Sequence, residues 1–285
     1  MTALKYDTVT FLSDYGHVDE FVGVVKSVIR SIAPAVTVVD LTHDVEPHDV
    51  RGGGLTLARS AQYLVPGVVL AVVDPGVATE RRAIAVEVGG GQSVLVGPDN
   101  GLLAPAVAMV GGATRAVALT NEDYQLPAPG PTFAGRDVFA PAAAYLCNGV
   151  DLEELGELVD PNTLMPGLMP VAREEAGAIV GDVLWVDRFG NAQLNVDPDE
   201  VATWGERIRL RFGDTTRTAR RVESYAALKT GEVGLVVDSY GLLSVSVDRG
   251  SASAEIGLRP GDPITLDPLV DEEDQSVPVQ LGRRQ

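Results

Sequence analysis

The chain has 285 residues, 45% of them hydrophobic and 22% charged, which is the composition of a folded protein with a sizeable core. Its 22 Lys and Arg residues against 40 Asp and Glu give a formal net charge of −18, and such a surface repels nucleic acid and anionic membranes. A single cysteine, Cys147, excludes an internal disulfide framework, and no apolar run approaches the ~20 residues of a membrane helix. We therefore expect a soluble, cytoplasmic protein. Its acidity serves solubility and also permits a cationic small molecule as ligand.

Short apolar strands alternate with helical stretches through the first 150 residues. In the stretch 19–33 the apolar residues recur at helical spacing, and Pro34 ends the pattern. Alternation of strands and helices predicts an α/β domain with a parallel or mixed sheet and helices on both faces. The predicted elements are strand 8–12, helix 19–33, strand 36–41, helix 50–63, strands 68–73, 84–88 and 93–96, and helices 101–110 and 138–147.

Polar residues follow the carboxyl ends of three predicted strands, at Asp14, His43 and Asp74. In open α/β sheets, ligands bind beyond the carboxyl ends of the strands. We therefore expect these three side chains to converge on one ligand site.

After about residue 160 the pattern changes to short β-like runs with frequent turns. We predict an α/β domain over residues 1–165, a Pro-, Met- and Gly-rich linker over 166–177, and a smaller, mostly β, barrel-like domain over 178–285. The tail after about Leu269 is expected to be loose. The strands expected in the second domain are 178–186, 193–195, 208–212, 215–219, 234–237, 242–247 and 263–266.

Acidic residues and histidines gather near the first two strand ends and raise the question of a metal site. Oxygen-rich clusters suit magnesium or manganese, yet no HxH, HExxH or CxxC spacing is present. Helix capping by Ser13 and Asp19, together with turn formation by Asp44, accounts better for this cluster. We expect no metal. The residues concerned are Asp14, Asp19, Asp40, His43, Asp44, His48 and Asp49.

Asp74 and Arg81 are harder to explain as ordinary loop residues. Asp74 follows the apolar strand 68–73, and Arg81 stands seven residues later, across a Pro-Gly turn. The guanidinium can return to pair with the partly desolvated carboxylate and keep it ionised and oriented. A purely structural ion pair remains open at this stage, and so does Arg82 as the partner.

Seven motifs follow one another from about residue 8 to residue 266, and their order is far more specific than any one of them. They are Phe11-Leu-Ser-Asp-Tyr-Gly16, Asp40-Leu-Thr-His43, Val73-Asp-Pro-Gly-Val77 with Arg81, Gly97-Pro-Asp-Asn-Gly-Leu102, Thr132-Phe-Ala-Gly-Arg-Asp137, Asp187-Arg-Phe-Gly-Asn191 and Val247-Asp-Arg-Gly250. Through these motifs the chain resembles the S-adenosylmethionine hydroxide adenosyltransferases, which are relatives of the fluorinase and chlorinase enzymes.

The resemblance implies an α/β domain and a β-barrel-like domain, assembled as a homotrimer. Ligand would lie between the first domain of one subunit and the second domain of its neighbour. The implied reaction is displacement at the ribose C5′ of S-adenosyl-L-methionine by water-derived hydroxide, which gives adenosine and L-methionine without a cofactor.

The resemblance also implies roles for single residues. Asp74 and Arg81 match two members of the family's water-activating triad, Asp14 matches the residue that holds the ribose hydroxyls, and Phe133 matches a pocket wall. In the second half, the matched residues are Asp187 and Asn191 for the ammonium and carboxylate region of methionine, Phe189 for adenine or ribose, and Ser239 and Arg249 for the amino-acid end. Core packing is the alternative for both phenylalanines, and turn or surface chemistry is the alternative for Asn191, Ser239 and Arg249.

One position departs from the family pattern. The third triad member is a histidine in the segment Thr-Phe-His-Gly-Arg-Asp, and this chain has Ala134 there. General bases typically contribute ~10²–10⁴-fold in rate, so we expect S-adenosyl-L-methionine to bind and its hydrolysis to be slow or absent. An engineered change and a natural variant both remain open as the origin of Ala134.

Other functions remain open beside hydrolysis. A chlorinase-like halogenase is disfavoured, because a carboxylate at Asp74 would repel a halide. A catalytically silent protein that binds S-adenosyl-L-methionine or adenosine is favoured only by Ala134. A metal-dependent phosphohydrolase is more distant still.

Overall fold

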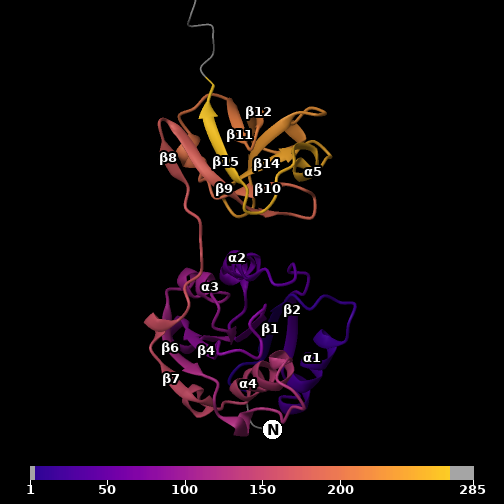
Figure 1. Ribbon diagram of the computed structural model, residues 1–285, viewed down its shortest axis with the longest axis vertical. Helices are drawn as coiled ribbons and strands as arrows, with labels where there is room; N and C mark the ends of the chain where they lie inside the picture. The colour runs from indigo at the N-terminus through magenta and orange to yellow at the C-terminus, as the bar shows by residue number, and fades with distance from the viewer. Residues whose placement is uncertain (1–3, 270–285) are drawn as a thin grey trace, which may run out of the picture. The chain divides into compact units, whose positions relative to one another are not determined.

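The computed structural model describes residues 4–269, which fall into two compact units (Figure 1). One unit ends at Met169 and the other begins at Pro170. This division lies within the stretch 166–177 that the sequence indicates as a linker, although Arg173–Glu175 within it forms a short strand, β8. The tail after about Leu269, expected to be loose, lies outside the described residues.

The first unit contains a seven-stranded mixed sheet, as the sequence pattern predicts. Its strands are β1 (Thr8–Ser13), β2 (Thr37–Thr42), β3 (Val68–Val72), β4 (Ala83–Val88), β5 (Ser93–Pro98), β6 (Ala113–Ala118) and β7 (Glu157–Val159). Their spatial order is β2-β1-β3-β5-β4-β6-β7, and the first four are mutually parallel while the rest run antiparallel to their neighbours. The sequence does not predict β6, which is alanine-rich, or β7, which is only 3 residues long.

Helices cover both faces of this sheet (Figure 1). They are α1 (Phe21–Ile32), α2 (Val50–Ser60), α3 (Ala104–Met109) and α4 (Ala140–Cys147). Helices α1 and α4 contact each other on one face, and α2 and α3 contact each other on the other. The side chains of β3 alternate between the two faces, because Leu70 and Val72 join the core with α1 and α4 while Val69 and Ala71 join the core with α2 and α3.

Two helix starts differ from the sequence-based expectation. Helix α1 begins after Glu20 without a side-chain cap, so the expected capping by Ser13 and Asp19 is wrong. Helix α4 is preceded by a π-helix over Gly135–Phe139, which holds the Gly-Arg-Asp part of the fifth motif. Single π turns are frequent at functional sites.

The second unit is a closed seven-stranded β-barrel with an additional edge strand. The barrel order is β10-β14-β13-β12-β11-β15-β9, β10 pairs with β9 to close it, and β8 extends the sheet beyond β9. The barrel strands are β9 (Ala178–Val186), β10 (Ala192–Leu194), β11 (Arg207–Phe212), β12 (Thr215–Val222), β13 (Val233–Val237), β14 (Leu243–Val247) and β15 (Pro263–Pro268). A short helix, α5 (Ala252–Ile256), follows β14 and is not predicted by the sequence.

Candidate active site

The carboxyl ends of β1 and β3 lie side by side. Ser13 pairs with Val72 in the parallel register, and the Asp14 N–H donates to the Val72 carbonyl at 3.3 Å. Asp14 and Asp74 therefore leave the sheet at the same edge.

Asp74 and Arg81 form a two-pronged ion pair. Arg81 Nε donates to Asp74 Oδ1 at 2.9 Å, and Nη2 donates to Oδ2 at 2.5 Å. The side chains are 6% and 14% exposed, so the pair is shielded from water. This bidentate geometry favours the charged carboxylate and fixes its plane. Arg82, the alternative partner, instead donates from Nε to Asp99 Oδ2 at 2.8 Å.

The Arg81 guanidinium connects this pair to the Thr132–Asp137 motif. Arg81 Cζ lies 5.2 Å from the centre of the Phe139 ring, at the end of the π-helix. Ala134 precedes the same π-helix as its N-cap and is 9% exposed. Its methyl group makes no hydrogen bond, so the side chain at position 134 offers the site no polar group.

A cavity of ≈ 650 Å³ opens beside Ala134. Its wall includes Asp137 and the proline-containing loop 126–131. Asp137 is already engaged, because Arg136 donates to its two carboxylate oxygens at 2.6 and 2.9 Å. A larger side chain at position 134 therefore has room on this side.

Asp14 lies on a turn that is fixed by hydrogen bonds. Its Oδ2 accepts from the His48 N–H at 2.9 Å, and the Gly16 N–H donates to the His43 carbonyl at 2.8 Å. Gly16 has a φ of +64°, a conformation that glycine adopts without strain. The second carboxylate oxygen, Oδ1, makes no hydrogen bond with residues 4–269, so it is able to accept one from a ligand hydroxyl.

A buried histidine directly after β2, His43, supports this turn. Ser13 Oγ lies 2.8 Å from His43 Nδ1, within hydrogen-bond distance. Ser13 therefore binds this histidine and does not cap a helix. His43 Nε2 lies 3.1 Å from Asp40 Oδ1 in a poorly aligned, electrostatic contact, and Lys26 Nζ donates to Asp40 Oδ2 at 2.6 Å. Burial lowers the pKa of His43, although Asp40 raises it, so the ring is neutral at pH 7. Because His43 is 1% exposed, it positions the turn rather than contacting a ligand.

Phe133 belongs to a cluster of aromatic rings. Its ring centre lies 5.0 Å from that of Phe21 and 5.8 Å from that of Tyr15, both edge to face. Arg136 Cζ lies 5.1 Å from the same ring. Phe133 is only partly buried, so packing does not use its whole surface.

In the second unit, Asp187 organises the loop between β9 and β10. Its Oδ1 accepts from the N–H groups of Phe189 and Asn191, each at 2.8 Å, and its Oδ2 accepts from Asn191 Nδ2 at 2.8 Å. Phe189 is 78% exposed, so the core-packing alternative for this residue is wrong.

Ser239 and Arg249 lie on exposed turns of the barrel. Ser239 is in the turn between β13 and β14, where Asp238 Oδ1 accepts from the Tyr240 N–H at 2.8 Å. The Arg249 side chain is 93% exposed, and its Nε lies 3.9 Å from Asp248 Oδ1. Among residues 170–269, neither side chain makes a hydrogen bond that would hold it in a fixed place.

Sequence reasoning missed two polar residues near these barrel loops, Tyr225 and Asp238, and one residue of the first unit, Tyr15. Burial raises the pKa of Tyr225, and Asp187 and Asp238 raise it further, which places this phenol within electrostatic reach of both loops. The proximity of Tyr225 to Asp187 and Asp238 depends on closure of the barrel, which no local sequence pattern indicates. Tyr15 directly follows Asp14 at a strand end, and that position is a signal that could have found it.

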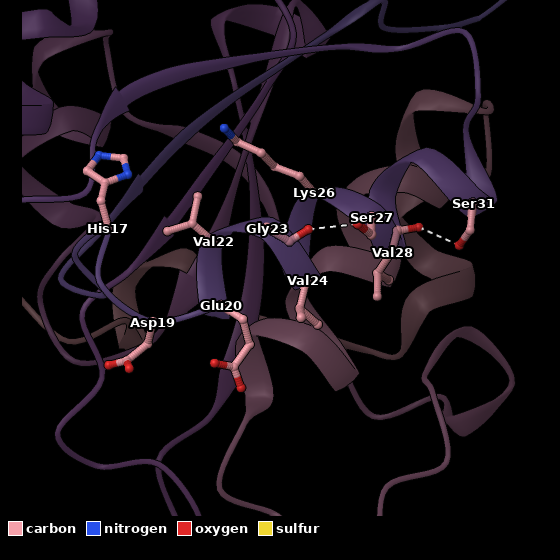
Figure 2. A pocket seen from close by; sticks show the side chains of 10 residues that line it. All are labelled: His17, Asp19, Glu20, Val22, Gly23, Val24, Lys26, Ser27, Val28 and Ser31. Carbon is pink, nitrogen blue, oxygen red and sulfur yellow. Dashed lines mark hydrogen bonds between the residues drawn. The ribbon is translucent and has the colours of Figure 1, made fainter.

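An open hollow of ≈ 660 Å³ runs along α1 (Figure 2). Figure 2 shows His17 and Lys26 on one side of the helix and Asp19 and Glu20 on the other. Lys26 is already paired with Asp40. The polar groups therefore do not converge on one point as a ligand site requires.

No group of three or more His, Cys, Asp or Glu side chains is placed to hold a metal ion within residues 4–269. Asp49, one of the metal candidates, caps α2 by accepting from the Gly52 N–H at 2.8 Å. In the same part of the chain, no helix combines the length and the apolarity that a membrane crossing requires.

Comparison with protein families matches both units. The family model described as the SAM hydroxide adenosyltransferase N-terminal domain matches residues 9–156, and the model of the C-terminal domain of the same family matches residues 181–265. A structure from Thermotoga maritima described as an uncharacterized conserved protein is similar with a TM-score of 0.83 and 32% identity, covering 91% of this chain and 99% of that one.

Named relatives point the same way. The (R)-S-adenosyl-L-methionine hydrolase of Salinispora tropica is 42% identical over 89% of this chain and 95% of its own length. The hydrolase of the same name from Thermus thermophilus is 42% identical over 90% of this chain and 98% of its own. A fluorinase from Actinopolyspora mzabensis is 27% identical over 89% and 94%, respectively.

Proposed function

The chain belongs to the S-adenosylmethionine hydroxide adenosyltransferase family, and from that membership we propose that it hydrolyses S-adenosyl-L-methionine to adenosine and L-methionine. The names of the relatives specify the (R) epimer, and we extend that preference to this chain. The observation that carries the proposal is the shielded Asp74–Arg81 pair at the carboxyl edge of the sheet.

The proposed chemistry is an in-line displacement at the ribose C5′. The oxygen of water forms a bond to C5′ while the bond from C5′ to sulfur breaks, and sulfur keeps the electron pair as a neutral thioether. Such a leaving group needs neither a general acid nor a cofactor. Asp74 accepts the proton that water loses, and Arg81 keeps the carboxylate charged and oriented. Asp14 accepts from the ribose hydroxyls, and Phe133 walls the pocket.

The second unit completes the ligand site within an assembly that we take to be a homotrimer. The exposure of Phe189 and Arg249 supports this proposal, because both side chains are free to contact a neighbouring subunit or a ligand. In this arrangement Phe189 packs on adenine or ribose, and the amino-acid part of the substrate is bound by Asp187, Asn191, Ser239 and Arg249. Because Cys147, the lone cysteine, is buried as a free thiol, we place the protein in the cytoplasm.

Complementation between two weakened variants tests the shared site. Asp74→Asn removes the proton acceptor, and Asp187→Ala removes the hydrogen bonds that hold its loop. When the two are co-expressed and assayed at low substrate, sites shared between subunits restore about a quarter of the parent rate, because one pairing in four joins two intact units. A rate no higher than the average of the separate variants contradicts the shared site.

Ala134 makes turnover slow in this proposal. The cavity beside it leaves room for Ala134→His, and we expect this replacement to raise kcat by about 10²-fold. Adenosine formed from (R)-S-adenosyl-L-methionine by the parent and the variant is the measurement. Equal rates would contradict a role for position 134. Binding without product from either protein would identify a silent binding protein, and a chloride-dependent chlorinated nucleoside would identify a halogenase.

A further inference from the structure

Tyr15 places a phenol group at the sheet edge that carries Asp14 and Asp74. It follows Asp14, and its N–H donates to Ser13 Oγ at 3.3 Å. Its ring centre lies 5.6 Å from that of Phe21 and 5.8 Å from that of Phe133. The Tyr15 ring is therefore fixed at the same sheet edge that carries Asp74.

The Tyr15 hydroxyl reaches the backbone beside Ala134. A Cβ atom added to Gly135 would lie 2.2 Å from the hydroxyl oxygen, so only glycine leaves space for the phenol there. Tyr15 is only partly buried, and its hydroxyl makes no hydrogen bond with residues 4–269. It is thus a polar group held next to position 134 with its hydrogen-bonding capacity unused.

The charge around Tyr15 keeps the phenol neutral. Burial raises its pKa above the ordinary value, and the nearby carboxylates of Asp14 and Asp74 raise it further, against the opposite effect of Arg81. A neutral phenol can both donate and accept a hydrogen bond, but it cannot take a proton from water.

We propose that the Tyr15 hydroxyl holds the attacking water beside Asp74, the task for which the family pattern has a histidine at position 134. This inference rests on the proposed hydrolysis. One hydrogen of the water points to Asp74, which takes that proton as the bond from oxygen to C5′ forms. The water donates a hydrogen bond to the Tyr15 oxygen through its other hydrogen, which it keeps, and a lone pair then faces C5′. Tyr15 keeps its own proton throughout, and sulfur leaves as the neutral thioether.

Removing the hydroxyl in two backgrounds tests this role. Tyr15→Phe keeps the aromatic packing, and in the parent chain we expect it to lower kcat about tenfold with KM unchanged within about twofold. In the Ala134→His background we expect a loss of less than about threefold, because the imidazole then holds the water. Such non-additivity in a double-mutant cycle reports a shared task.

Two controls separate the hydroxyl from general effects on the fold. Tyr124→Phe removes a hydroxyl that donates to Glu154 Oε2 at 2.9 Å, and it should leave kcat unchanged in both backgrounds. Thermal unfolding of Tyr15→Phe should occur at or above the parent temperature, because the lost hydroxyl has no hydrogen-bond partner within the described residues, 4–269.

Every outcome decides one of the two proposals. Equal kcat for the parent and Tyr15→Phe overturns the role of Tyr15 and leaves the hydrolysis standing. If Tyr15→Phe lowers kcat equally in the parent and in the Ala134→His background, the role of Tyr15 is also overturned. The same holds if Ala134→His turns over substrate and the parent does not. No adenosine from the parent or from Ala134→His overturns the proposed function, and the role of Tyr15 with it.

Discussion

The Asp74 and Arg81 side chains of the first unit are 6% and 14% exposed, whereas in the second unit Phe189 is 78% exposed and the Arg249 side chain 93%. The first pair is fixed by two hydrogen bonds between side chains in a shielded place. In the second unit, the loop of Phe189 is held through backbone N–H groups that donate to Asp187.

In the proposed function, this difference separates the groups that act in catalysis from those that only bind the substrate. Groups that stabilise a transition state work best when they are oriented before the substrate arrives, which requires a rigid and dry surrounding. Groups that only bind the substrate can be exposed until the ligand and another surface cover them. We therefore expect changes in the first unit to alter kcat and changes in the second unit to alter KM.

The largest effect is expected from Asp74→Asn. The amide cannot accept the proton from water, so kcat should fall by ~10²–10⁴-fold with a KM change of only a few-fold. Asp99→Asn is the matched control, because the Asp99 side chain is also 6% exposed and paired with an arginine. Steady-state kinetics of both variants, with thermal unfolding as the fold check, should show similar stability and very different kcat. Equal losses of kcat in both variants would contradict the role of Asp74 as the proton acceptor.

A smaller effect, with the opposite kinetic signature, is expected from Asp187→Ala. Its loop loses three hydrogen bonds to the carboxylate, so KM for S-adenosyl-L-methionine should rise about 10–100-fold. At saturating substrate, kcat should stay within about threefold of the parent. A kcat loss as large as that of Asp74→Asn would erase the distinction between the two units.

Stability should also distinguish the packed Phe133 from the exposed Phe189. Phe133→Ala removes a ring that packs on Phe21 and Tyr15, and it should cost about 2 kcal/mol. Phe189→Ala should change the free energy of unfolding by less than about 0.5 kcal/mol, because the ring is exposed. Denaturant unfolding of both variants measures the difference. A similar cost for both would mean that Phe189 is packed in solution.

The smallest expected effect is the pH dependence of the stability of the first unit. Burial lowers the pKa of His43 in the folded state, so below its ordinary value of about 6.5 the unfolded chain binds the proton more readily. Stability should therefore fall as the pH drops from 7 towards 5. His43→Asn should flatten this slope, and His17→Asn, at an exposed position, is the control. An unchanged slope in His43→Asn would rule out His43 as its source.

Local patterns predict most of the first unit because a strand end and a helical stripe are short-range features. The pairing of Asp74 with Arg81 follows from their spacing across a Pro-Gly turn, and the structure confirms it over Arg82. The role of Ser13 does not follow from local pattern. Capping is the local expectation, whereas its actual partner, His43, is 30 residues away. Closure of the barrel by β10 and β9 is likewise a tertiary contact that no single motif encodes.

The contact between Tyr15 and Gly135 makes two distant positions dependent on each other during evolution. Any side chain at position 135 would collide with the phenol, so loss of the glycine requires a smaller residue at position 15 first or at the same time. A shift of the phenol would in turn disturb the Phe21 and Phe133 rings that enclose it. Lineages of this protein should therefore exchange the tyrosine and the glycine as a unit, and grafts of the site onto a related scaffold should carry both.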